Sequence, residues 1–382
     1  MKNKISHTEI YGRMDRIMME EKWNTPRDMM QEPIYIPFRP DVAAPADIRQ
    51  VICRDHTGEA LFPAQNTRKE NAEGIVMIAT AEKGCDKTLI PVTAPAPELP
   101  DSYGVQLIFQ ENEQTLQVLI NGRLFTSYVY DSRLVKPYLG PIFNSAGGSY
   151  TRVDPTAKEH PHHRSVFLGV GEVNGVDFWN EHGNYGYQKH MKFSAIKSGP
   201  AFGTFTAENT WQDAAGKPLI DESRTFTFYN QTPDCRYIDM MIRFTAAYED
   251  VVFGQTKEAG PLGVRMNDIL RADRGGHFTN SYGALNESEC WGRSAVWCDY
   301  RGILDGRTCG VAVFDHQSNE RHPTAWHIRN YGLFAPNNLY FKGGFTIVRG
   351  ETVTYRYRLC FYEGDRTDIG SRYLIYANYA NL

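Results

Sequence analysis

Residues 223–230 read SRTFTFYN and residues 236–246 read RYIDMMIRFTA, and these two stretches decide the fold. In the first, Phe226 and Phe228 alternate with threonines, so every second side chain of an extended chain lies on the same face. A two-residue period of this kind is typical of a β-strand that packs one face against a core. Both stretches also contain aromatic and β-branched residues, which favour strands. We therefore predict a β-strand in each.

Strand-like runs of the same kind occupy most of the chain on either side, and no repeat of fixed period or convincing helical stretch interrupts them. The main runs are VQLIFQ (105–110), TLQVLING (115–122), RLFTSYVY (123–130), SVFLGVGEV (165–173), GTFTAENTW (203–211), GVRM (263–266), CGVAVFD (309–315) and TVTYRYRLCFY (352–362). We expect an all-β fold, in which residues 101–382 form one large antiparallel β-sandwich that carries the functional site.

Residues 1–100 are expected to form a smaller N-terminal region. Residues 7–22 carry apolar side chains at helical spacing, which predicts one amphipathic helix. The runs YIPF, RQVIC and GIVMIAT follow, broken by Pro and Gly, and predict a small β region. The Pro-rich stretch PVTAPAPELPDS (91–102) then marks either a linker or a crossover between sheets.

The composition excludes several classes of protein. Of the 382 residues 41% are hydrophobic and 13% aromatic, which is enough for a substantial core and argues against disorder. The net charge is −4, with acids and bases interleaved, so we expect no nucleic-acid partner. No stretch approaches the roughly 20 apolar residues of a membrane helix, so we expect no membrane partner either.

Seven cysteines are scattered along the chain without a CxxC pair. This pattern argues against a zinc ribbon and a redox dithiol, and it favours a reducing compartment. The N-terminus has no apolar signal segment, so we expect the protein in the cytoplasm. A phosphate-binding Gly loop, a GxGxxG motif and a GxSxG elbow are all missing, which predicts that no nucleotide cofactor is used.

The densest group of histidines is EHPHHR at residues 159–164. Three imidazoles in four positions are costly to bury without partners, because each has a second nitrogen that needs a hydrogen bond. In an extended segment His160, His162 and Arg164 share one face, and His163 points away. Two such histidines can ligate a metal ion or bracket a hydroxylated ligand. The alternative is a solvated loop.

The segment NGVDFWNE (174–181) places Asp177, Trp179 and Glu181 on one side if it is extended. A carboxylate beside an exposed Trp suits a sugar, because the ring stacks on the apolar face and the acid accepts hydroxyl protons. The alternative is an ordinary turn with Trp179 in the core.

The segment KEAGPLGVRM (257–266) places Glu258 before a Gly/Pro corner and Arg265 inside a strand. Glu258 is a candidate general base, and Arg265 is a candidate for stabilising an oxyanion or a carboxylate. A structural ion pair between the two is the alternative.

The richest polar group follows the strand-like run CGVAVFD, and loops at the ends of sheets are where sites are commonly built. In an extended segment His327, Arg329 and Tyr331 share a face. The candidate site residues of this group are His316, Asn319, His322, His327, Arg329 and Tyr331.

Six motifs together resemble the bacterial PmoA-like domain family, many members of which carry a "methane oxygenase" label. The resemblance covers about residues 130 to 365. The motifs are KPYLGPIF (136–143), GGSYTRVDP (147–155), HPHHRSVFLGVGEVNGVDFW (160–179), EAGPLGVRM (258–266), WCDYRG (297–302) and VFDHQSNERHPTAWHIRNYGLFAPN (313–337). A methane monooxygenase subunit is a membrane protein, and this chain has no apolar span, so the label itself is not supported.

The resemblance implies a supersandwich like that of galactose mutarotase and other sugar-acting proteins. It also implies a functional partnership with sugar oxidoreductases of the Gfo/Idh/MocA type, since such proteins accompany them in carbohydrate-use gene clusters. An oxidised sugar such as a 3-keto-glycoside is then the expected substrate. The family supplies no settled catalytic residues to carry over.

We therefore expect a carbohydrate-active enzyme, a lyase or hydratase that cleaves a 3-keto-glycoside by His/Glu acid–base chemistry. A mutarotase or epimerase, a glycoside hydrolase and a noncatalytic glycan-binding module are the alternatives. The expected catalytic residues are His162, His163, Glu258, His316 and His327. The expected substrate-binding residues are His160, Arg164, Asp177, Trp179, Arg265, Asn319, His322, Arg329 and Tyr331. One divalent metal ion and a homo-oligomer are left open.

Overall fold

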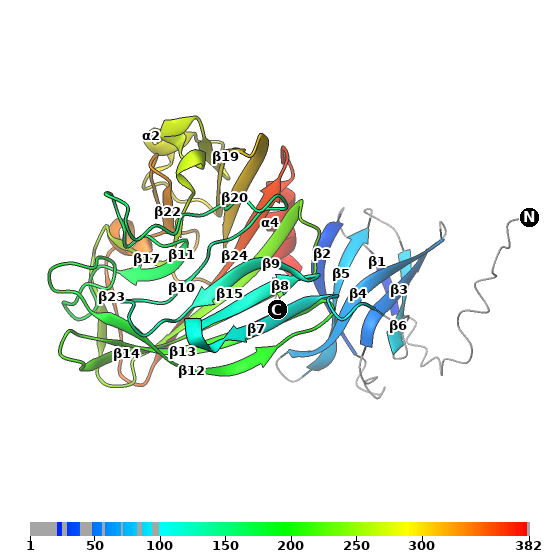
Figure 1. Cartoon of the computed structure of the whole chain (residues 1–382), viewed down its shortest axis with the longest axis horizontal. Helices are drawn as coiled ribbons and strands as arrows, with labels where there is room; N and C mark the ends of the chain where they lie inside the picture. The colour runs from blue at the N-terminus through cyan, green and yellow to red at the C-terminus, as the bar shows by residue number, and fades with distance from the viewer. Residues whose placement is uncertain are drawn as a thin grey trace, which may run out of the picture.

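The protein is all-β, as expected, and its core is a large sandwich of two antiparallel sheets (Figure 1). The computed structural model describes residues 21–24, 29–38, 48–55, 58–69, 72–81, 86–93 and 99–379. None of the helices in these residues is long and apolar enough to span a membrane.

A six-stranded antiparallel sheet precedes the sandwich, with strand order β1-β6-β3-β4-β5-β2. Its strands are β1 (Glu21–Asn24), β2 (Met29–Pro37), β3 (Ile48–Asp55), β4 (Gly58–Lys69), β5 (Ala72–Ala81) and β6 (Asp86–Thr93). A helix was expected over residues 7–22. Residues 7–20 lie outside the described residues, and residues 21 and 22 belong to strand β1.

The sandwich consists of two eight-stranded sheets, which we call sheet I and sheet II. In spatial order, sheet I contains β21 (Trp326–Ile328), β22 (Leu333–Pro336), β17 (Ala259–Arg265), β11 (Val166–Val170), β10 (Tyr138–Leu139), β9 (Arg123–Val129), β8 (Thr115–Ile120) and β7 (Val105–Gln110). Sheet II contains β12 (Tyr187–Lys197), β13 (Phe202–Gln212), β14 (Pro218–Tyr229), β15 (Cys235–Thr245), β24 (Thr352–Glu363), β20 (Arg307–Asp315), β19 (Trp297–Leu304) and β18 (His277–Asn280).

A small ribbon and several short helices complete the described chain. They are β16 (Val251–Phe253) paired with β23 (Phe345–Ile347), the α-helices α2 (Asn286–Cys290), α3 (Asn338–Lys342) and α4 (Ile369–Tyr379), and the 3₁₀ helices η1 (Glu111–Glu113), η2 (Asp268–Leu270) and η3 (Ala272–Arg274).

The main core lies between sheets I and II and follows the two-residue period of the strands. In β14, Phe226 and Phe228 are 1% and 0% exposed and join this core, while Thr225 and Thr227 point to the opposite face. Burial of one such side chain contributes about 1.5–3 kcal/mol to stability. The alternation that predicted this strand is therefore also the source of its packing energy.

The helix α4 was not expected, and it packs on the outer face of sheet II. Ile369, Tyr373, Tyr376 and Ala377 form its buried stripe, at the i, i+4, i+7, i+8 spacing of a helix face. Tyr373 and Tyr376 contact the ring of Phe314 in β20 at 5.8 and 5.9 Å. The helical stripe was present in the sequence, but its aromatic residues suit strands equally well.

Figure 1 shows the N-terminal sheet (blue) at one end of the sandwich, with β10, β11, β17 and β22 toward the other end. The red helix α4 lies between the sandwich strand β24 and strand β2 of the N-terminal sheet.

A buried network of charges joins these three parts. Glu32 of β2 is 1% exposed and accepts hydrogen bonds from Arg372 of α4 (2.9 Å) and from the hydroxyl of Tyr237 (2.6 Å). Arg358 of β24 lies 3.8 Å from the same carboxylate and donates two hydrogen bonds to Asp239 (2.6 and 2.8 Å). Burial raises the pKa of Glu32, and the charges of Arg372 and Arg358 oppose that rise. The N-terminal sheet is thus docked through one carboxylate held by two buried guanidinium groups.

Replacement of Glu32 by Ala leaves Arg358 and Arg372 buried without this partner. We expect E32A to lower the free energy of unfolding by about 1–3 kcal/mol, because buried donors of Arg372 and Tyr237 lose their acceptor while Asp239 and Asp368 still pair with the guanidinium groups. Urea denaturation followed by circular dichroism measures this loss.

The matched control is E249A, which removes the partner of Lys217 in a pair whose side chains are 45% and 59% exposed. We expect this exposed pair to contribute less than about 1 kcal/mol. Equal losses in the two variants would refute the role given to Glu32.

Candidate functional site

Strand alternation directs polar side chains onto the outer face of sheet I. In β21, Trp326 and Ile328 point into the main core, so His327 between them points to the outer face. In the same way Val264 and Met266 point inward and Arg265 points outward. His327 and Arg265 are nevertheless 1% and 0% exposed, so other parts of the chain cover this face.

An apolar cluster lies on the same outer face and forms a base for these polar groups. Phe167 contacts the ring of Trp179 at 5.2 Å, and Trp179 is fully buried. Trp179 therefore belongs to an outer core and is not the exposed sugar platform considered above. The members of the cluster are Phe167, Trp179, Leu333 and Ala335, with Tyr138 and Tyr331 packed against them.

The histidines at residues 160–163 form a compact group, which we call the imidazole cluster. The backbone of His160 has φ 48°, in the left-handed region, so the segment turns and is not extended. As a result His163 does not point away: its ring lies 4.8 Å from that of His160 and 4.4 Å from that of His162. The extended arrangement expected for this run is wrong, because the turn brings all three rings together.

The imidazole cluster meets the 327–331 segment, which is more than 150 residues away in sequence. The ring of His160 stacks on Tyr331 at 4.6 Å. His163 contacts Trp179 at 5.3 Å, and Trp179 contacts His327 at 6.2 Å. Two of the sequence motifs therefore converge at one place on sheet I.

Arg265 provides a buried positive charge at this place. Its guanidinium lies 5.1 Å from the ring of Tyr331, 3.3 Å from Asp268 and 3.6 Å from Glu159. Burial, together with the nearby charge of Arg152, lowers the pKa of Arg265 to about 10. Arg265 remains charged at neutral pH.

Lys136, Arg164 and Glu181 form a charged group beside the imidazole cluster. Arg164 binds the Glu181 carboxylate with two hydrogen bonds, one of them at 2.7 Å, and Nζ of Lys136 lies 3.7 Å from the same carboxylate. Lys136 is 1% exposed and donates to the carbonyl of Trp179, and burial lowers its pKa to about 8. Burial alone would raise the pKa of Glu181, but Arg164 and Lys136 outweigh it and lower that pKa.

Lys136 and Glu181 were not among the expected site residues, and neither was Arg152, which donates to the carbonyls of Glu159 and His160 (3.0 and 2.9 Å). Lys136 and Arg152 do stand inside the motifs KPYLGPIF and GGSYTRVDP. A charged residue that opens a largely apolar run was the available signal.

Several buried polar atoms at this site have no hydrogen-bond partner among the described residues. Buried polar groups in proteins are nearly always hydrogen-bonded, so a concentration of exceptions points to a missing ligand or water. These atoms are Nε2 of His162, both ring nitrogens of His163, Nδ1 of His160 and of His327, Nε and Nη1 of Arg265, and Nε of Arg152.

The imidazoles are neutral at physiological pH. Burial, reinforced by the positive charge of Lys136, lowers the pKa of His162 to about 3. Burial and the charge of Arg329 lower the pKa of His327 to about 3 as well. The pKa of His163 is also well below its ordinary value, because of burial and the neighbouring His162. Each neutral ring has one donor and one acceptor nitrogen, which suits a ligand with hydroxyl and carbonyl groups.

Glu258 and Arg329 lie at the margin of the site. Glu258 is half-buried, forms an ion pair with Lys257 (3.0 Å), and contributes to the electrostatic environment of His160 and Tyr331. Arg329 lies 5.6 Å from the ring of Tyr331 and forms an ion pair with Glu287 (3.0 Å).

Asp177 has a structural role in the turn that precedes Glu181. Its carboxylate accepts hydrogen bonds from the backbone N–H groups of Trp179 (2.7 Å) and Asn180 (3.0 Å). The turn positions Trp179 in the outer apolar cluster and Glu181 next to Arg164.

His316, Asn319 and His322 belong to a different group, built around Asp315 at the end of β20. Asp315 accepts hydrogen bonds from Asn319 (2.8 Å) and from the backbone N–H of Thr324 (2.8 Å), and it lies 2.8 Å from Nδ1 of His322. The ring of His316 packs against Tyr376 of α4 at 5.3 Å. Their partners come from sheet II and α4, so we exclude them from the candidate site.

The described residues contain no group of three or more His, Cys, Asp or Glu side chains arranged to hold a metal ion.

Residues 115–372 match the model of a family of unknown function, DUF6807. The match includes the imidazole cluster and every other residue assigned to the site above. No curated protein matches the chain.

The buried imidazoles make stability depend on pH. Below the ordinary pKa of 6.5 an unfolded His162 or His327 takes up a proton, whereas the folded side chain does so only near pH 3. The folded state then binds fewer protons than the unfolded state. The free energy of unfolding therefore falls by about 1.4 kcal/mol for each histidine with every unit by which the pH is lowered. We expect the urea midpoint to fall between pH 6.5 and pH 4.5, and to fall less in H162Q.

The control is H182Q, which changes an exposed histidine in the loop that follows Glu181. We expect its pH dependence to equal that of the unmodified protein. If H162Q shows the same slope as H182Q, His162 does not have the lowered pKa described above.

Proposed function

The chain belongs to the DUF6807 family, whose function is not known, and we propose that it is a carbohydrate-active enzyme acting on a keto-sugar or 3-keto-glycoside. The observation that carries this proposal is the set of unpartnered imidazole and guanidinium nitrogens around the imidazole cluster. They combine neutral hydrogen-bonding groups with a buried positive charge. A polyhydroxylated ligand that develops negative charge on a carbonyl oxygen uses both kinds of group.

The proposed reaction starts with removal of the proton at C2 of the sugar, which a ketone at C3 makes acidic. Glu258 is the base in this proposal, because it is a half-buried carboxylate beside His160 and Tyr331. The electron pair of the C2–H bond moves to the C3 oxygen and forms an enediolate. Arg265 stabilises this negative charge, and the neutral ring of His162 or His163 donates a hydrogen bond to it.

In the second step the C1–O bond breaks by elimination. The enediolate re-forms the C3 carbonyl, a C1=C2 double bond appears, and the departing alkoxide takes a proton from an acid. Lys136 is suited to stabilise the departing alkoxide with its positive charge, since its pKa of about 8 keeps it mostly protonated at neutral pH. Addition of water across the double bond is the hydratase version of the same chemistry.

The hydroxyl of Tyr331 is the proposed sugar contact in place of the ring of Trp179. The ring of Tyr331 itself is held by stacking on His160 and by the guanidinium of Arg265. Tyr331 is partly exposed, and burial raises its pKa to about 12, so its hydroxyl stays neutral and can donate a hydrogen bond.

An oxidoreductase of the Gfo/Idh/MocA type is the proposed source of the 3-keto substrate, since oxidation at C3 must precede the elimination. We place this chemistry in the cytoplasm. Five buried cysteines of the sandwich are free thiols, which suits a reducing compartment: Cys235, Cys290, Cys298, Cys309 and Cys360.

The test is turnover of p-nitrophenyl 3-keto-β-glucoside, with p-nitrophenol release followed by absorbance. We expect turnover of the keto-glycoside and none of the unoxidised glucoside. E258Q should lower kcat/KM by about 10²–10⁴, the usual contribution of an acid–base group, and H162Q by about 10²–10³, the usual contribution of a donor to an oxyanion. Assays with and without added Mn²⁺ and with EDTA reveal any dependence on a divalent metal.

E249Q is the matched control, since Glu249 is an exposed carboxylate paired with Lys217 away from the site, and its activity should be unchanged. Equal turnover of both glycosides would point to a hydrolase and overturn the elimination. Exchange of the C2 proton in D₂O without product would indicate an epimerase, and anomer interconversion alone a mutarotase. Saturable binding without any of these reactions would indicate a glycan-binding module.

A further inference from the structure

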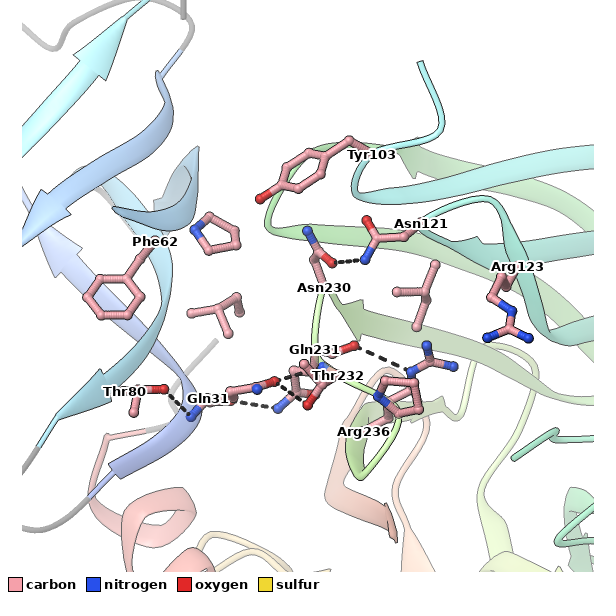
Figure 2. A pocket seen from close by; sticks show the side chains of 14 residues that line it. Gln31, Phe62, Thr80, Tyr103, Asn121, Arg123, Asn230, Gln231, Thr232 and Arg236 are labelled. Carbon is pink, nitrogen blue, oxygen red and sulfur yellow. Dashed lines mark hydrogen bonds between the residues drawn. The ribbon is translucent and has the colours of Figure 1, made fainter. Parts of the chain in front are cut away.

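A cavity lies between the N-terminal sheet and the near edge of the sandwich (Figure 2). Its volume is about 450 Å³, which is within the range of roughly 300–1,000 Å³ found for small-molecule sites. It shares no residue with the imidazole cluster, and nothing in the proposed reaction uses it.

The two sides of this cavity differ in character. The N-terminal sheet contributes apolar surface through Phe62 of β4 and Ile78 of β5. The sandwich contributes the ring of Tyr103 and the amides of Asn121 and Asn230, which Figure 2 shows facing the N-terminal sheet. One wall is therefore suited to an apolar face of a ligand and the other to polar groups.

Hydrogen bonds hold the polar wall in place. Asn121 donates to the side-chain oxygen of Asn230 (2.8 Å), and the side-chain nitrogen of Asn230 donates to the carbonyl of Pro200 (2.8 Å). Gln231 donates to the carbonyl of Gln31 in β2 (2.7 Å), and so connects the wall to the N-terminal sheet. These hydrogen bonds hold the loop between β14 and β15, which forms part of the polar wall, against both the sandwich and the N-terminal sheet.

Two guanidinium groups, from Arg123 of β9 and Arg236 of β15, line the same side of the cavity. Arg236 is 7% exposed, lies 5.1 Å from the ring of Phe125 and donates a 3.4 Å hydrogen bond to the carbonyl of Gln231. Burial, together with the positive charge of Arg123, lowers the pKa of Arg236 to about 10. Within the described residues neither arginine has a carboxylate within ion-pair distance.

The nearest acidic groups are already bound to other partners. Glu363 accepts hydrogen bonds from the backbone N–H and hydroxyl of Ser145 (2.6 and 2.7 Å) and lies 3.5 Å from Arg307. Asp234 forms an ion pair with Arg366 (2.7 Å). Two like charges therefore line one cavity, and the carboxylates of Glu363 and Asp234 offset them only from a greater distance, so an anion between the two guanidinium groups is favoured.

We propose that this cavity is a binding site for a small organic oxyanion, a carboxylate- or phosphate-bearing molecule of about monosaccharide size. Its anionic group lies between Arg123 and Arg236, where planar guanidinium groups match the geometry of carboxylate and phosphate oxygens. The rest of the ligand lies against Phe62 and Tyr103. Because the walls come from both parts of the chain, the ligand strengthens the docking of the N-terminal sheet on the sandwich.

Isothermal titration calorimetry with D-glucuronate and with inorganic phosphate tests this proposal, with neutral glucose as the comparison. We expect saturable binding of at least one of the two anions, weakened at high salt, and no comparable binding of glucose at this site. R123Q and R236Q should each weaken anion binding at least tenfold. A rise in Tm with the bound anion should disappear in the same variants.

R133Q is the matched control, because Arg133 is an exposed arginine (86%) paired with Asp131 and remote from the cavity. Its anion affinity should equal that of the unmodified protein. If R236Q does not fold, the exposed Arg123 carries the test, since its replacement leaves the buried structure intact.

The proposal is overturned if neither anion binds, if R123Q binds as tightly as R133Q, or if glucose binds equally well. H162Q separates this site from the candidate active site: anion affinity lost in H162Q and kept in R123Q would place the binding at the imidazole cluster instead. Loss of turnover with intact anion binding would reject only the enzymatic function.

Discussion

The two-residue alternation of side chains in sheet I is the constraint on which the candidate site depends. A strand in a sandwich must send every second side chain away from the core, whatever that side chain is. In β21 and β17 the residues sent outward are His327 and Arg265, and the apolar neighbours on both sides hold them there. The backbone of the sheet is rigid, so these groups have fixed positions before any ligand arrives, which is the condition for preorganised electrostatic stabilisation.

Much of the fold was predictable, because strand alternation is a local property. The runs around Phe226 and Phe228 showed which face packs, and the structure has the same faces in the core. The helix α4 was missed because the tyrosines of its stripe suit strands as well as helices, although their spacing is that of a helix face. Where aromatic residues dominate a segment, its composition alone therefore does not distinguish a helix from a strand, and the spacing of the apolar side chains has to decide.

The candidate site was predictable only as residue types near strands. His160 turns through a left-handed conformation and brings three imidazoles together, and Arg152, seven and eight residues earlier, holds the carbonyls of this turn. His322 and His327 lie five positions apart but belong to different groups, because Asp315 at the end of β20 binds His322 and the backbone of Thr324. These contacts close irregular loops, and the two-residue period of the strands does not encode them.

Desolvation is used in opposite ways in two regions of the molecule. At the imidazole cluster burial removes charge, and His162 and His327 are kept neutral beside the cations Lys136 and Arg329. In the network at Glu32 the charges are kept, and each is matched by a partner of opposite sign. The first arrangement leaves neutral ring nitrogens available for a ligand, and the second holds the N-terminal sheet on the sandwich through paired charges.

The joint at Glu32 also has a consequence for biosynthesis. The hydrogen bond from Arg372 to Glu32 connects residues 340 positions apart. At about 5–20 residues per second, a ribosome needs roughly 20–70 s to make the intervening chain. Throughout that interval the first sheet has emerged without the helix that anchors it, and its edge strands are open to pairing with other nascent chains.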